Sequence, residues 1–315
     1  MDDARVNLEL FFTVSAGLLG LIVGSFANVV IHRVPLDESI AFPASRCPAC
    51  RTPIRAWQNV PVVSWLLLGG RCASCRVPIS SRYPLVEALH GAGFAALMAR
   101  FGPTPFTPVL FLLFFALVVL ALIDWDHQIL PDVITLPGIL VGLATTLVPG
   151  ALVGWRDAAL AAAAGYLSFF VVAEGYARLR NIEGLGMGDW KLAAMMGAFL
   201  GLRRLLLVVF LASVSGMVYG LFQAFRLRAR GERVSPLPEP EERALEAKSG
   251  DSSSSLSSPT ESNDPVEEAR PDDAAPPDSI GRYKLPFGTF LAGAALLVLF
   301  AGDEILFWYG GLFLP

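Results

Sequence analysis

The sequence predicts an all-α polytopic membrane protein of about eight transmembrane helices, with a small module held together by four cysteines between the first two. Three observations predict this fold. Hydrophobic residues make up 54% of the 315 residues and charged residues only 17%, which is outside the usual range of soluble proteins. The apolar residues fall into runs near the ~20 residues that a helix needs to cross ~30 Å of hydrocarbon. All four cysteines lie in one loop.

The expected transmembrane helices follow the apolar runs in chain order. The first run is longer than the ~7–15-residue apolar core of a secretory signal, and no Ala-x-Ala site follows it, so we expect a retained helix. We expect the helices at residues 10–30, 85–99, 106–123, 133–153, 158–173, 190–202, 205–225 and 285–300.

These helices divide the chain into five parts. Residues 1–32 form the first transmembrane helix, 33–84 the four-cysteine module, 85–228 a transmembrane core, 229–280 a linker, and 281–315 the last transmembrane helix with the C-terminus. The linker is rich in Ser, Pro, Glu and Asp, a composition that buries too little apolar surface to offset the entropy of ordering. We therefore expect the linker to be disordered.

The distribution of arginine predicts the orientation of the chain. If the N-terminus lies outside, the outer segments carry only Arg5, Arg100, Arg156, Arg203 and Arg204. The inner loops then carry a larger set, namely Arg33, Arg46, Arg51, Arg55, Arg71, Arg76, Arg82, Arg178, Arg180, Arg226, Arg228, Arg230 and Arg233. The positive-inside rule therefore places the cysteine module and the linker in the cytoplasm. No basic run is interleaved with aromatic residues, so we expect no nucleic-acid partner.

The cysteines form two Cys-x-x-Cys pairs, Cys47 with Cys50 and Cys72 with Cys75. Each pair can place two thiolates on one side of a tight turn, and two such turns complete a tetrahedral zinc site. With four protein ligands and no open position, the zinc would be structural, stapling the cytoplasmic module. The alternative is two disulfides, which form on the oxidising face of a membrane, against the arginine distribution.

Two aspartates stand at the ends of expected helices. Asp124 lies in the last turn of the third apolar run and Asp189 in the first turn of the sixth. Because two crossings separate them, the chain returns to the same face, which the arginine distribution makes cytoplasmic. A carboxylate at the bilayer centre costs ~2.5–3.5 kcal/mol and less toward the interface, so both residues are candidates for function.

A pair of carboxyl groups can hydrolyse a peptide bond. Two close carboxyl groups do not both ionise easily, so one keeps its proton. The ionised member can draw a proton from an attacking water, while the protonated member donates to the peptide carbonyl. Gly184, Gly186 and Gly188 precede Asp189 and permit the close approach of an extended substrate. The alternative is that these glycines form a turn and Asp189 caps a helix.

The combination of motifs resembles the bacterial prepilin peptidases, also called type 4 prepilin leader peptidases, of the membrane aspartic peptidase family A24. The resemblance covers nearly the whole chain. The segments that carry it are residues 24–33, 58–66 and 79–84, the two cysteine pairs, Asp124 with Pro131-Asp132, residues 186–191 and residues 285–288. The acidic linker departs from the compact loop that is usual in the family.

This resemblance implies a membrane aspartic endopeptidase of the bacterial inner membrane, with Asp124 and Asp189 as its catalytic residues. Its substrates would be type IV prepilins or type II secretion pseudopilins, whose leader peptide it cleaves on the cytoplasmic side. Membrane lipids would surround the enzyme as further partners. Many members also methylate the new N-terminal residue with S-adenosylmethionine, so we expect a bifunctional enzyme with N-methyltransferase activity. The sequence has no glycine-rich dinucleotide loop, and no residue is assigned to the methyl donor.

Two functions of other classes stay open as alternatives. An ion-coupled transporter also uses intramembrane carboxylates, but it predicts inverted repeats and carboxylates near the bilayer midplane, and the sequence indicates neither. A zinc-stapled membrane assembly protein would use the two aspartates only as helix caps.

Overall fold

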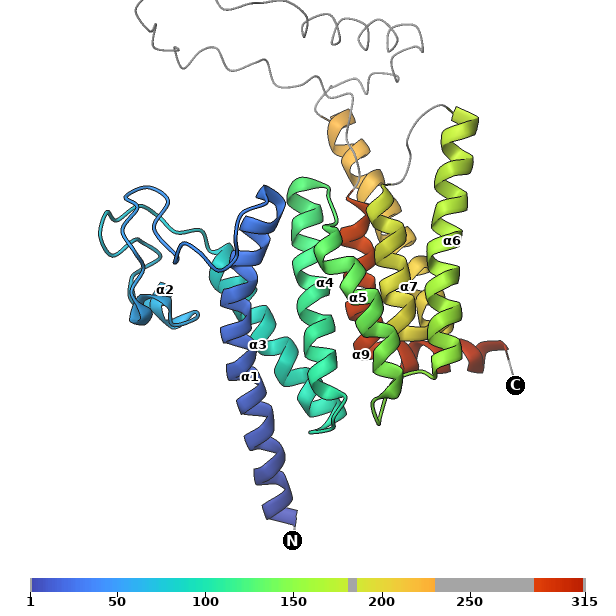
Figure 1. The fold of residues 1–315 in the computed structure, drawn as a ribbon, viewed down its shortest axis with the longest axis horizontal. Helices are drawn as coiled ribbons and strands as arrows, with labels where there is room; N and C mark the ends of the chain where they lie inside the picture. Colours follow the sequence, from blue (N-terminus) through green and yellow to red (C-terminus); the bar gives the residue numbers. More distant parts are fainter. Residues whose placement is uncertain (1, 181–185, 230–285, 314–315) are drawn as a thin grey trace, which may run out of the picture. The chain divides into compact units, whose positions relative to one another are not determined.

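The chain is helical throughout the part that the structure, a computed structural model, describes: residues 2–180, 186–229 and 286–313 (Figure 1). These residues contain two isolated β-bridges and no strand. The prediction of an all-α fold is therefore confirmed. The helices are α1 (Asp2–Arg33), η1 (Val34–Leu36), η2 (Ala56–Asn59), α2 (Val63–Leu67), α3 (Arg82–Phe101), α4 (Thr107–His127), α5 (Asp132–Ala144), η3 (Thr145–Leu147), α6 (Trp155–Arg180), α7 (Met187–Ala229) and α9 (Phe287–Phe313).

Five of the described helices, α1, α4, α6, α7 and α9, are long and apolar enough to cross a membrane. The chain is therefore a multi-pass membrane protein. The region expected as a helix at residues 133–153 is a shorter apolar stretch, Asp132–Leu147. The number of about eight crossings stays a prediction.

The chain divides into two compact units, Met1–Gly216 with Pro286–Pro315, and Met217–Leu285. Of the second unit, the structure describes only the end of α7, as far as Ala229. Residues 230–280 of the expected linker lie outside the described residues. All the features discussed below belong to the first unit.

Helices α1 and α3 lie side by side (Figure 1). Glycines on α1 allow this approach, because a Cβ atom added to Gly24 would lie 2.7 Å from Cα of Glu87, and one added to Gly20 would overlap the carbonyl oxygen of His90. Small residues at helix contacts let two backbones approach closely in a membrane. The contact brings the end of α1 beside the start of α3.

The segment between α1 and α3 is tied back to both helices by hydrogen bonds. The guanidinium of Arg33, at the end of α1, donates to the carbonyl oxygens of Ser39 and Pro43 at 2.9 and 2.8 Å. The backbone N–H of Val62 donates to Oε2 of Glu87 on α3 at 2.7 Å. The cysteine-bearing segment is therefore anchored to the transmembrane helices rather than only joined to them.

Helix α4 packs against α9 in the apolar core (Figure 1). Phe94 of α3 stacks on Phe111 of α4 with ring centroids 4.3 Å apart, and Phe114 of α4 lies edge-on to Phe300 of α9 at 6.3 Å. Such aromatic pairs add to the stabilisation that burial of their surface gives. These contacts fix α3, α4 and α9 relative to one another.

Helix α7 bends at Gly201, where φ is 76°. A positive φ favours glycine, which has no Cβ to clash with its own backbone. The backbone N–H of Leu202 donates to Oδ1 of Asp157 on α6 at 3.3 Å, so Asp157 caps the segment after the bend. The two helices expected at 190–202 and 205–225 are therefore present as the two parts of α7, and the break between them lies at Gly201 rather than at Arg203 and Arg204.

Candidate functional site

The two aspartates predicted as a catalytic pair lie buried where three helix ends converge. Asp124, in the last turn of α4, is 5% exposed, and Asp189, in the first turn of α7, is 7% exposed. They are close enough to interact electrostatically. A Cβ atom added to Gly188 or to Gly288 would lie 2.7 or 2.8 Å from the Leu130 side chain. The starts of α7 and α9 therefore meet at the end of α4.

The first turn of α9 holds the carboxylate of Asp124. The backbone N–H of Thr289 donates to Oδ2 of Asp124 at 2.6 Å. The hydroxyl of Thr289 lies 3.0 Å from the same oxygen and 2.9 Å from the carbonyl oxygen of Ala121, so its single proton serves one acceptor at a time. A hydrogen bond donated to a carboxylate favours its ionised form.

Two ion pairs surround the aspartates. Nζ of Lys191 lies 2.6 and 2.7 Å from the two carboxylate oxygens of Asp132, which joins the start of α7 to the start of α5. Arg82 at the start of α3 pairs with Asp126 at 2.5 Å, two residues beyond Asp124. Asp126 and Asp132 are thereby engaged by cations, whereas Asp124 and Asp189 form no ion pair among the described residues.

The two cysteine pairs lie in turns of the same design. Residues 46–54 and 71–79 share the pattern Arg-Cys-x-x-Cys-Arg-x-Pro-Ile. In each turn the N–H of the first cysteine donates to a carbonyl five residues later, at 3.0 and 2.9 Å. The residue after the second cysteine, Arg51 or Arg76, has a positive φ of 55° or 61°.

The four thiols gather into one cluster. The Sγ atoms of Cys47, Cys50, Cys72 and Cys75 all lie within 4.8 Å of one another. Those of Cys47 and Cys75 are 3.8 Å apart, close to the ~3.8 Å between ligands of a tetrahedral zinc with Zn–S bonds of ~2.3 Å. All four cysteines are free, so the disulfide alternative is not supported. The cluster could hold a metal ion.

The chemistry of one thiol also suits metal binding. Sγ of Cys50 lies 3.3 Å from the hydroxyl oxygen of Thr52. The hydroxyl and the backbone N–H of Thr52 donate to the thiolate form of this sulfur and lower the pKa of Cys50 to about 6. The thiolate, which is the form that binds metals, is therefore accessible at neutral pH.

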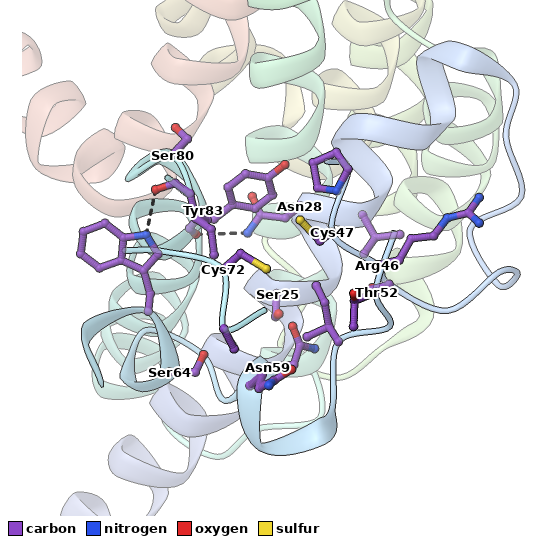
Figure 2. Close-up of a pocket in the computed structure, with 18 of the residues that line it drawn as sticks. Ser25, Asn28, Arg46, Cys47, Thr52, Asn59, Ser64, Cys72, Ser80 and Tyr83 are labelled. Carbon is purple, nitrogen blue, oxygen red and sulfur yellow. Dashed lines mark hydrogen bonds between the residues drawn. The ribbon is translucent and has the colours of Figure 1, made fainter. Parts of the chain in front are cut away.

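A cavity of about 460 Å³ lies between the cysteine turns and the two helices that flank them. Figure 2 shows side chains from α1, both turns and the start of α3 around it, among them Ser25, Asn28, Cys47, Asn59, Cys72 and Tyr83. The three segments 24–33, 58–66 and 79–84, which are far apart in the sequence, each contribute residues to its wall.

Two known protein families match this chain, one over the segment with the cysteines and one over the segment with the two aspartates. Residues 18–101 match the Bacterial Peptidase A24 N-terminal domain, and residues 111–221 match the Type IV leader peptidase family. The chain belongs to the type IV leader peptidase family. The four cysteines lie in the first match, and Asp124 and Asp189 lie in the second.

Curated members of the type IV leader peptidase family are similar to most of the chain. A prepilin leader peptidase/N-methyltransferase of Myxococcus xanthus is 47% identical over 71% of this chain and 66% of its own length, slightly under two thirds. Proteins of the same name from Neisseria gonorrhoeae and Pseudomonas aeruginosa are 43% and 38% identical, over 69% and 75% of this chain and 84% and 88% of their own lengths. No solved structure matches the chain.

The structure adds two features to the leader-peptidase site that the sequence analysis did not find. One is Thr289, which contacts Asp124 although 165 positions separate them. The only feature of the sequence that could have indicated Thr289 is its position directly after the family-like segment 285–288. The other is the cavity, whose lining comes from three family-like segments that no single motif connects. Gly184, also expected at the site, lies outside the described residues, and Gly186 lies beside Asp189, where an added Cβ would be 3.8 Å from Oδ2.

Proposed function

We propose that this chain is a bifunctional membrane enzyme, an aspartic endopeptidase that removes the leader of type IV prepilins and an N-methyltransferase that modifies the new N-terminus. The observation that carries the peptidase half is the pair of buried carboxylates, Asp124 and Asp189, brought together at helix ends. Membership of the type IV leader peptidase family supports it. The names of the curated relatives support both halves.

The contacts of the two carboxylates suggest a division of roles. Asp124 accepts the N–H of Thr289 and is the ionised member, which takes a proton from the attacking water. Asp189 keeps its proton and donates it to the carbonyl oxygen of the scissile peptide. When the intermediate collapses, the carbon–nitrogen bond breaks, the amine leaves with the proton that Asp124 took up, and a hydroxyl of the intermediate returns a proton to Asp189.

We place the reaction on the cytoplasmic side of the bacterial inner membrane, and we include type II secretion pseudopilins among the substrates. The surplus of arginine in the loops on this side supports the orientation. Both kinds of substrate would reach Asp124 and Asp189 from the surrounding membrane lipids, because helices long enough to cross a membrane carry both residues.

We propose zinc as the metal of the four-thiol cluster, held by Cys47, Cys50, Cys72 and Cys75. The separation of Cys47 and Cys75 and the all-sulfur ligand set suit zinc. Four protein ligands leave no position for water, so the metal would stabilise the module and not catalyse. S-adenosylmethionine, when bound, would supply the methyl group for the new amine.

Cleavage of a type IV prepilin by detergent-purified protein tests the peptidase half. Asp124→Asn and Asp189→Asn should each lower the rate by about 10²–10⁴-fold, the range that a general acid or base contributes. Asp126→Asn is the matched control on α4, because its carboxylate pairs with Arg82, and it should stay within about threefold of wild type. Undiminished cleavage by both variants would overturn the catalytic roles of Asp124 and Asp189, whereas a wild-type protein that cleaves no prepilin would leave the transporter and the assembly protein as the remaining alternatives.

A further inference from the structure

The cavity beside the cysteine turns has the properties of a small-molecule site. Its volume of about 460 Å³ falls within the ~300–1,000 Å³ usual for such sites. Polar groups reach it from several elements: Ser25 and Asn28 from α1, Asn59 from η2, and Glu87 from α3. Aromatic rings of Trp65 and Tyr83 and apolar side chains complete its wall, so both a flat apolar group and a polar one find partners there.

One carboxylate in this cavity has no cationic partner. Glu87 is only 9% exposed, and it forms no ion pair among the described residues. Its Oε2 accepts the N–H of Val62, and Ser25 also hydrogen-bonds to its side chain. Buried carboxylates are rare unless a positive charge or several hydrogen bonds compensate them. A ligand with a positive centre would complete the environment of Glu87.

Asn59 offers a second contact. Its side chain lines the cavity and is exposed, and it forms no hydrogen bond with the described part of the chain. Figure 2 shows Asn59 and Ser25 at the same side of the cavity, across from Tyr83. The amide can therefore donate to and accept from a polar ligand without first breaking a bond within the protein.

We propose that this cavity binds S-adenosylmethionine, with the carboxylate of Glu87 facing its sulfonium and the amide of Asn59 bonding its polar groups. This inference rests on the proposed methyltransferase activity. The ligand combines the features that the wall would recognise: a cationic sulfur, an aromatic base and a polar sugar. The thiol cluster forms part of the same wall through Cys47 and Cys72, so the metal would shape the site without contacting the methyl group.

The test compares two ligands that differ in one respect. S-adenosylmethionine carries a positive sulfonium, whereas S-adenosylhomocysteine has a neutral thioether and is otherwise the same apart from the methyl group. Binding of each to the full-length protein in detergent is measured by isothermal titration calorimetry. The variant Glu87→Gln keeps an acceptor for the N–H of Val62 but removes the charge. Glu174→Gln on α6 removes one carboxylate that pairs with Arg178 on the same helix and serves as the matched control.

The expected result is selective. Glu87→Gln should weaken binding of S-adenosylmethionine by about 10- to 100-fold, as the loss of a charge-assisted contact does, and leave that of S-adenosylhomocysteine within about threefold. The side chain of Asn59 forms no hydrogen bond with the described part of the chain, so Asn59→Ala should not disturb the fold. This variant should weaken the binding of both ligands severalfold. Glu174→Gln should match wild type for both ligands.

Two results separate the failure of the inference from the failure of the function. Wild-type protein that binds both ligands, with Glu87→Gln equal to wild type or equally weakened for both, overturns the placement of the methyl donor and leaves the methyltransferase activity standing. Wild-type protein that binds neither ligand and leaves cleaved pilin unmethylated removes the activity itself, and the inference with it. Unchanged affinities in Asn59→Ala overturn the contact assigned to the amide.

Discussion

Replacing Gly288 with alanine should disturb the candidate active site without changing its ionisable groups. A Cβ atom at this position would lie 2.8 Å from Cδ1 of Leu130 and 3.0 Å from Oδ2 of Asp124. Carbon atoms in favourable contact are ~3.5–4.0 Å apart, so the first contact is too close by about 0.7 Å or more. Leu130 has little room to turn away, because Gly188 also lies beside it: a Cβ added to Gly188 would be 2.7 Å from Cβ and 3.2 Å from Cδ1 of Leu130.

The size of the effect follows from these overlaps. Relieving them requires the start of α9 or the end of α4 to move by several tenths of an ångström, and overpacking of this kind costs about 1–3 kcal/mol. A misplacement of catalytic groups by ~1 Å can lower a rate by ~10²-fold. We therefore expect kcat/KM for prepilin cleavage to fall by about 10- to 100-fold in Gly288→Ala.

Gly293→Ala on the same helix is the matched control. An added Cβ there meets nothing within 4 Å, and the position is exposed. Alanine in place of a helical glycine should stabilise α9 by roughly 0.5–1 kcal/mol and leave cleavage unchanged. Both rates are measured on purified protein with a defined amount of prepilin, alongside thermal unfolding. Equal activity of the two variants would refute the close approach of α9 to Asp124.

Other substitutions test the remaining contacts. Thr289→Val keeps the backbone N–H but loses the hydroxyl, which should slow cleavage about tenfold, while Thr289→Ser should restore most of the rate; the reverse order would contradict a role for the hydroxyl. Asp132→Asn should cost less than about fivefold in cleavage, because the pair with Lys191 is partly exposed, and a loss as large as that of Asp189→Asn would make Asp132 catalytic. The double variant Cys47→Ser, Cys72→Ser should lose about one zinc per chain in metal analysis, and unchanged zinc content would sink the metal assignment.

Local patterns in the sequence were enough to predict the long apolar helices. The apolar run before Asp124 predicted α4, since its residues are hydrophobic almost without a break. The spacing of two crossings between Asp124 and Asp189 predicted that both carboxylates meet, and the structure places them close enough to interact. The four cysteines were also predicted as one cluster from a local pattern. The Cys-x-x-Cys spacing lets each pair place two thiolates on one side of a tight turn, and two such turns complete a metal site.

Contacts between distant segments could not be predicted in this way. Nothing in the residues around Thr289 indicates that its N–H reaches Asp124, because that contact depends on the packing of α9 against α4. The break between the helices expected at 190–202 and 205–225 lies at Gly201, slightly earlier than predicted, where Asp157 of another helix caps the following segment. The cavity depends on the approach of α1 to α3, which the glycines of α1 permit but do not by themselves reveal.

The cysteine turns make the two proposed reactions depend differently on zinc. Cys47 and Cys72 belong both to the thiol cluster and to the wall of the cavity, whereas Asp124 and Asp189 belong to neither. If the proposed zinc and methyl-donor sites are as assigned, removal of the metal should lower methylation and leave cleavage at Asp124 and Asp189 unchanged.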